Sequence, residues 1–227
     1  TALVLPGGLN ERAAEMQKQA ASVSVAGYPP RINLLSSTSK AVAQGKGGVG
    51  DWLMTMSATA HINFGKTLDC CVLMSRAKAI HNDPRKLRIS YDVNDAVFKE
   101  IIALSKNAAT KSEAWYGPEF LLWLPPNEDH NYAGGLVTFH CGSWSSRVAA
   151  EQLATFVQKP CRFGSIMLEN KKKQTYPGPK YELSQDVTIE ECNAWLQANS
   201  EAAEVLIKSF LEPDAERDAV NEEVANR

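Results

Sequence analysis

RFGSIMLENKKKQTYPGPKYEL, residues 162–183, predicts a β-hairpin with a lysine-rich tip. The first arm is apolar at Phe163, Ile166 and Leu168, as expected for a strand. Three consecutive lysines follow, and because like charges repel one another they require either solvent or a polyanion. They are Lys171, Lys172 and Lys173. The second arm, TYPGPKYEL, is stiffened by prolines and ends in an apolar residue.

The residues of this hairpin suggest two interpretations. Cations interleaved with aromatic rings suit single-stranded nucleic acid, because cations contact phosphates and flat rings stack on unpaired bases. The residues that would do so are Arg162, Lys171, Lys172, Lys173, Tyr176, Lys180 and Tyr181. The alternative is a solvated turn with a structural role only.

Size and composition are those of an ordinary globular protein. The chain has 227 residues, of which 44% are hydrophobic and 22% are charged, enough for one sizeable core. No apolar run reaches the roughly 18–20 residues of a membrane span, and no signal peptide is recognisable. The five cysteines form no CxxC pair, which favours reduced thiols and a cytoplasmic location. No cofactor or metal site is predicted.

Charge is divided along the chain. From Ser184 onward there are 11 acidic and 3 basic residues, whereas the preceding part has 21 basic and 15 acidic residues. The net charge of −2 therefore combines a body of +6 with a C-terminal part of −8. A basic body can bind a polyanion, and an acidic end can compete for the same surface.

Hydrophobic patterning predicts about eight strands and several helices. Residues 9–22 form a weakly amphipathic helix in an N-terminal arm. A capping box at Thr188 and Glu191 begins the C-terminal helices, which Pro213 ends. The predicted strands are residues 31–36, 51–62, 67–75, 86–91, 119–125 and 136–141 and the two hairpin arms, with further helices at 97–104 and 148–157.

The order of these elements predicts the fold. Helices follow pairs of strands rather than each strand, which favours an α+β protein with a mainly antiparallel sheet. We expect an elaborated oligonucleotide-binding (OB-like) barrel with helical insertions and a C-terminal helix. The expected parts are an arm (1–30), the barrel (31–183), C-terminal helices (184–211) and a flexible acidic tail (212–227).

A second basic cluster extends the predicted nucleic-acid surface. It comprises Arg76, Lys78, Arg85, Lys86 and Arg88. Lys46 in the Gly-rich segment 44–50 and the ring of Trp52 complete the candidate set. The segment KGGVG resembles a phosphate-binding loop, but Asp51 and Trp52 stand where Lys-Thr is required, so nucleotide hydrolysis is not predicted.

Hydrolysis by other groups is an alternative. Ser143 or Cys141 could act as nucleophile with a histidine as base, but the glycines of a nucleophile elbow are missing around GSWSS. The candidate bases are His61, His81, His130 and His140. A metal site at His61, Cys70 and Cys71 lacks a recognised spacing.

Four segments, taken in order, resemble phage- and prophage-encoded single-stranded DNA-binding proteins. They are PRINLLSSTSK (30–40), KTLDCCVLMSR (66–76), FLLWLP (120–125) and LENKKKQTYPGPKYEL (168–183), followed by an acidic end. The resemblance implies an oligonucleotide-binding fold, sequence-tolerant binding of single-stranded DNA in phage replication or recombination, and no catalysis. It also implies a host-cell cytoplasmic location. It leaves open a homo-oligomer and contact of the acidic C-terminus with replication or recombination proteins, since the sequence ends in Val224-Ala225-Asn226-Arg227 and not in the terminal Phe of many such proteins. A virion or assembly protein is the alternative from another class.

Overall fold

The computed structural model describes residues 29–57 and 59–226, with side chains as far as residue 223. The helix predicted at residues 9–22 lies outside the described residues. The strands are β1 (Arg31–Leu34), β2 (Trp52–Thr55), β3 (His61–Gly65), β4 (Leu68–Asn82), β5 (Leu87–Ser90), β6 (Ala114–Leu124), β7 (Gly135–His140), β8 (Lys159–Glu169) and β9 (Thr175–Glu182). The helices are α2 (Lys40–Ala43), α3 (Ala96–Lys106), α4 (Trp144–Ala154), α5 (Ile189–Ala198), α6 (Ser200–Leu211) and α7 (Ala215–Asn226).

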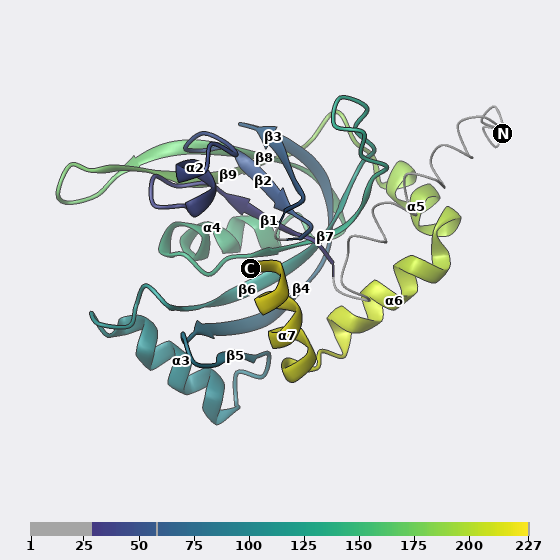
Figure 1. Cartoon of the computed structure of the whole chain (residues 1–227). Helices are drawn as coiled ribbons and strands as arrows, with labels where there is room; N and C mark the ends of the chain where they lie inside the picture. The colour runs from purple at the N-terminus through teal and green to yellow at the C-terminus, as the bar shows by residue number, and fades with distance from the viewer. Residues whose placement is uncertain (1–28, 58, 227) are drawn as a thin grey trace, which may run out of the picture.

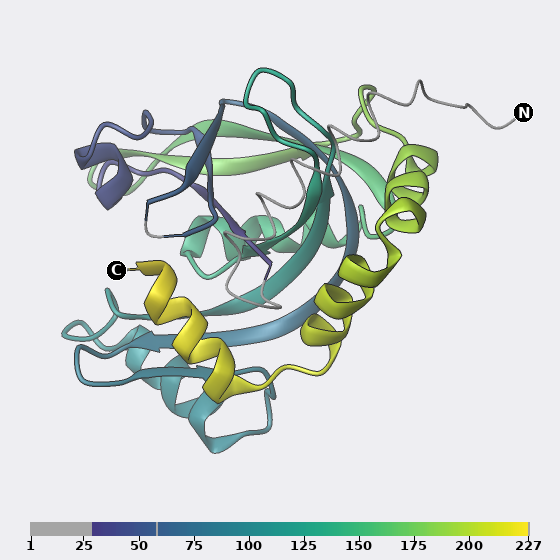
Figure 2. The same cartoon turned by 45° about the vertical axis from the view of Figure 1, so that its right-hand side comes forward.

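All of these strands belong to one sheet, in the order β3-β2-β1-β7-β6-β4-β8-β9, with β5 also paired to β4. Every strand pair is antiparallel except β1 with β7. The sheet curves strongly around α4 (Figures 1 and 2). The α+β, mainly antiparallel prediction is confirmed. The described strands form an open sheet rather than a closed barrel, because β3 and β9 are edge strands and do not pair.

Alternation along the strands gives the sheet two buried faces. On β6, Phe120 and Leu122 point into the core that α4 completes with Leu153. Leu121 and Trp123, the intervening residues, pack with α5 and α6 through Cys192, Ala203 and Phe210. This apolar strand lies inside the sheet, between β7 and β4. Helix α3 packs separately on Ala79 and Ala114.

Three strand boundaries differ from the prediction. The segment predicted as one strand at 51–62 is broken by a turn in which the Met56 N–H donates to the Ala60 carbonyl at 3.0 Å. Its two halves are the separate strands β2 and β3, which pair with each other as a hairpin. Strand β4 continues through Arg76 to Asn82, because its second half pairs with both β6 and β5. Strand β6 begins at Ala114, five residues before the predicted start at 119, and so includes Trp115.

The C-terminal part is mainly helical, with α5, α6 and α7 joined by short non-helical segments. The capping box is confirmed, since the Glu191 N–H donates to Thr188 Oγ1 while the Thr188 N–H donates to the Glu191 carboxylate. The expected flexible tail is corrected, because residues Ala215–Asn226 form α7, which lies beside β5 (Figure 2). Asp218 and Glu222 are buried, so this helix docks through charged groups that sequence patterning assigned to solvent.

Candidate functional site

A groove of about 1130 Å³ opens between the β1–α2 segment, the β8–β9 hairpin and the first turn of α4. Side chains of β4, β6 and α7 also line it and bring buried charges to the site. The charged and aromatic lining residues are Arg31, Lys40, Lys46, His61, Lys78, Trp115, Glu119, Phe139, His140, Trp144, Glu169, Lys171, Tyr176 and Glu222. Cations, flat rings and hydroxyls are therefore gathered from segments far apart in sequence.

Asn170 builds the tip of the β8–β9 hairpin. Its side-chain oxygen accepts the N–H of Lys172 at 2.8 Å and the N–H of Gln174 at 3.1 Å. Lys173 closes the turn with a left-handed φ of 59°. Lys171, Lys172 and Lys173 are all exposed, and Lys171 lines the groove. The predicted hairpin with a solvent-exposed lysine tip is confirmed.

Two aromatic side chains line the groove near this tip. Tyr176 comes from β9, and Trp144, the first residue of α4, is 62% exposed. The first turn of α4 lies against β9 at Gly178, where a Cβ would come within 2.4 Å of Leu168 Cδ1. That atom belongs to β8, so glycine here makes room for the Leu168 side chain, while Ser145 Cβ of α4 lies at an ordinary contact distance of 3.8 Å from the same point.

Two predicted base-stacking residues are corrected, because their rings lie in the core. Trp52 is fully buried and packs edge-to-face with Phe139 and Phe163, at 5.3 and 5.1 Å between ring centroids. Tyr181 is 2% exposed and packs edge-to-face on Phe163 at 4.8 Å. Neither ring has an exposed face on which a base could stack.

Two predicted phosphate contacts belong to a buried charge network. The Lys78 ammonium donates to Glu119 at 2.8 Å and to Glu222 at 2.9 Å. The Arg76 guanidinium also donates to Glu119, at 2.7 Å, and lies between the rings of Tyr91 and Phe210. Both cations are corrected from exposed contacts to paired groups, because each has its partners inside the fold.

Electrostatics of this network follow from burial and pairing. Burial alone would raise the pKa of Glu119, but the charges of Lys78 and Arg76 outweigh it and lower the pKa to about 2. Burial lowers the pKa of Lys78 even though Glu119 opposes the shift. His140 Nε2 donates to the Lys78 carbonyl at 3.2 Å, and burial lowers the pKa of the His140 imidazole to about 4. Glu119 is the carboxylate on which both neighbouring cations depend.

Two more of the predicted cations are paired on the outside of the sheet. Arg162 donates two hydrogen bonds of 3.0 Å to Asp69 and a further one to Asp186. Arg88 donates to Glu100 at 2.9 Å. These ion pairs join strand to strand and strand to helix, while each arginine stays partly exposed.

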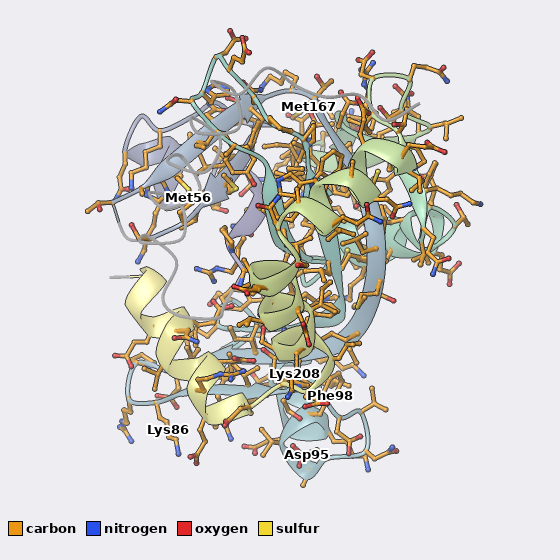
Figure 3. All side chains as sticks on the ribbon, turned by 90° about the vertical axis from the view of Figure 1, so that its right-hand side faces the viewer. Met56, Lys86, Asp95, Phe98, Met167 and Lys208 are labelled. Atoms are coloured by element: carbon orange, nitrogen blue, oxygen red, sulfur yellow. The ribbon has the colours of Figure 1, made fainter. Side chains whose placement is uncertain are left out.

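The remaining predicted cations are accessible but separate. Arg85 and Lys86 are exposed at the β4–β5 turn, and Figure 3 shows Lys86 and Met167 of β8 at opposite ends of the molecule. Lys180 is exposed on β9, 3.2 Å from Glu182. Lys46 lines the groove, where its Nζ lies 2.8 Å from His61 Nε2. The two basic clusters therefore do not form one continuous surface.

The structure adds residues that sequence reasoning missed. Arg31, at the start of β1, pairs with Glu222 of α7. Lys40 of α2 also lines the groove. The signal for Arg31 was weak, because one arginine before an apolar strand is common, and nothing local connects it to a glutamate 191 residues later.

The hydrolase alternative finds no support in the geometry around Cys141. Its thiol is buried, and burial raises its pKa, which disfavours the thiolate. Ser143 caps α4, where its Oγ accepts the Ser146 N–H at 3.2 Å. Among the described side chains, no group of three His, Cys, Asp or Glu is placed to hold a metal ion.

Comparisons with protein families, with curated proteins and with solved structures found no match for this chain. Within the described ranges, no helix is both long enough and apolar enough to cross a membrane.

Proposed function

We propose that this protein binds single-stranded DNA in the groove, without strong sequence preference and without catalysing a reaction. One observation carries the proposal: Lys171, Tyr176 and the exposed ring of Trp144 line the same groove. Cations that follow a phosphate backbone, combined with accessible rings, are the requirements for binding unpaired nucleotides. The resemblance to phage single-stranded DNA-binding proteins suggests a role in replication or recombination in the host cytoplasm.

The roles within the groove follow from accessibility. Lys171, Lys172 and Lys173 contact phosphates at the rim, and Lys46 adds a cation on the β1–β2 side. Tyr176 and Trp144 stack on bases. Because stacking recognises the π-face of every base, little sequence preference results. Glu222 already neutralises cations in the groove, so the acidic C-terminus competes with the incoming strand.

A virion or assembly protein is the second candidate. Ile166 and Met167, which are 43% and 56% exposed on β8, favour it, because apolar side chains on an exposed strand suit contact with another protein. In that case the hairpin binds a protein subunit and not a nucleic acid.

Tryptophan fluorescence during titration with oligo-dT tests the proposal. We expect quenching in the parent and clearly less quenching in Trp144→Phe, which keeps a stacking ring and most of the affinity but leaves Trp115, another tryptophan that lines the groove. Trp144→Ala should lose about 1–3 kcal/mol of binding free energy. Trp195→Phe, on α5 away from the groove, is the matched control and should quench like the parent.

The two candidates give different outcomes. Weak binding to a duplex of the same length, together with oligo-dT binding that Trp144→Ala reduces, supports single-strand binding. Absence of oligo-dT binding at low salt contradicts it and leaves the assembly role.

A further inference from the structure

Helix α6 presents apolar side chains to solvent as well as to the sheet. Ala203 and Phe210 are buried against the sheet, whereas Val205 and Leu211 are 56% and 63% exposed. A helix that only covers a sheet ordinarily has a polar outer face. Helix α6 therefore has more apolar side chains than its packing on the sheet requires.

A second groove runs along one flank of α6, next to the side that packs on the sheet and opposite Val205. Its volume is about 490 Å³, and it lies between the end of α5 and α6. Leu196, Ala203, Ile207 and Leu211 supply the apolar lining. The α6 members are spaced by four residues, so they follow one face of the helix over nine residues, or about 13 Å at 1.5 Å per residue. A partner helix of two to three turns would match that length.

The rim of this second groove is acidic. Glu204 and Glu212 lie along it with one cation, Lys208. The C-terminal part of the chain has a net charge of −8, so the surrounding field has the same sign. An apolar strip flanked by carboxylates complements a helix that flanks its own apolar strip with Lys or Arg. A second copy of this chain would instead bring a like-charged rim to the contact.

We propose that the α5–α6 groove is a docking site for a basic amphipathic helix of a partner protein. The site lies on the far side of the molecule from the β8–β9 hairpin (Figure 1). A bound partner helix therefore leaves the nucleic-acid groove open, so both ligands bind together. Simultaneous binding of both ligands rests on the proposed function, whereas recognition of the partner helix does not depend on the nucleic-acid groove.

A fluorescein-labelled synthetic 18-residue peptide tests the proposal. It carries Leu at positions spaced by three and four residues and Lys on both flanks, and a scrambled peptide has the same composition. Fluorescence anisotropy with the full chain should show micromolar binding of the amphipathic peptide and at least tenfold weaker binding of the scrambled one. Leu211→Ser should weaken binding about tenfold. Val220→Ser, an equally exposed position on α7, is the matched control and should leave it unchanged.

Charge reversal and competition complete the experiment. Glu204→Lys with Glu212→Lys should weaken binding at least tenfold, with thermal unfolding used to confirm that the fold is intact. Saturating oligo-dT should change peptide affinity less than twofold. Equal binding of the scrambled peptide, or no effect of Leu211→Ser, would overturn the proposal.

Other occupants give distinct results. A dimer in light scattering that Leu211→Ser dissociates would assign the groove to a second copy. Tighter peptide binding after deletion of residues 1–28 would assign it to this chain's own N-terminal segment. Either outcome overturns the proposal. Absence of oligo-dT binding contradicts the proposed function alone, since the peptide result does not depend on it.

Discussion

The hairpin tip (Lys171–Lys173) is open to a ligand, whereas the cations of the charged floor beneath α7 are paired. The floor consists of Arg76, Lys78 and their shared carboxylate, Glu119. Lys171, Lys172 and Lys173 are consecutive, and three adjacent ammonium groups cannot all be buried with partners. Lys78 occupies an alternate position on a strand, where a single face can be buried. Its partners come from residues 41 and 144 positions away. Whether a basic residue binds a ligand depends on whether the fold brings it a carboxylate.

The largest expected effect concerns the floor. Glu119→Ala should lower the free energy of unfolding by about 3–5 kcal/mol, because it leaves buried Lys78 and half-buried Arg76 without their shared carboxylate. Lys172→Ala at the exposed tip should change it by less than about 0.5 kcal/mol. Urea denaturation of both variants measures the difference.

Acidification provides an independent check of this prediction. The pKa of Glu119 is about 2 in the folded protein, against 4.5 for an unperturbed glutamate. The stability that ionised Glu119 gives the fold is therefore complete above about pH 4.5. It is lost as the pH falls toward 2, and Glu119→Ala should lack that part of the acid response. Equal stability of the two variants at pH 7 would mean that the network does not hold the floor together.

The second prediction concerns binding at the tip. Replacing Lys171, Lys172 and Lys173 by Ala should flatten the log–log salt dependence of oligo-dT binding by up to about 2, since each phosphate contact contributes about 0.7. Affinity should fall similarly for all sequences. Electrophoretic shifts over a salt series measure the slope.

The second basic cluster is the control for this experiment. Arg85→Ala with Lys86→Ala should leave the slope unchanged, because these exposed residues of the β4–β5 turn do not line the groove; Figure 3 shows Lys86 at the opposite end of the molecule from Met167 of β8. A flattened slope in this variant would extend the binding surface to the β4–β5 turn.

The smallest expected effect concerns competition between α7 and single-stranded DNA for the groove. A chain ending at Leu211 lacks α7 and should bind oligo-dT more tightly at low salt, by about tenfold if α7 covers the floor in about nine molecules of ten. The difference in affinity between the full and the shortened chain should narrow as salt screens the ion pairs of α7. The fold should persist, because the described buried residues of α7, Asp218, Asn221 and Glu222, are all polar.

A point substitution distinguishes competition by Glu222 from other effects of removing α7. Glu222→Gln should reproduce part of the gain, while Glu216→Gln, an exposed change on the same helix, should not. Equal affinity of the full and shortened chains at low salt would show that α7 and the strand do not share a surface.

Local patterns predicted much of the fold. The β8–β9 hairpin, the capping box at Thr188 and the apolar strand around Leu122 all depend on neighbouring residues, and all are present. The division of residues 51–62 into two strands was missed, because alternation continues through the turn. Helix α7 was missed because its buried residues are Asp218, Asn221 and Glu222, which by themselves indicate solvent.

The candidate site was predicted only where its residues are local. Lys171 and Tyr176 belong to one hairpin, whereas Trp144 became a strong candidate only once its 62% exposure beside β9 was known. Trp52 and Tyr181 were misassigned because aromatic residues in strands suit both a core and a binding surface. Sequence alone does not decide which face of a strand is buried.

Strand β4 has a consequence for synthesis of the chain. One of its edges pairs with β8, and the joined residues Asp69 and Arg162 are 93 positions apart. At about 5–20 residues per second, the ribosome needs roughly 5–20 s to add that intervening segment. During this time the first half of β4 has an unpaired edge, with Leu68, Cys70 and Val72 uncovered on one side. Such an edge pairs readily with other chains, so the nascent protein depends on rapid delivery of β8 for its solubility.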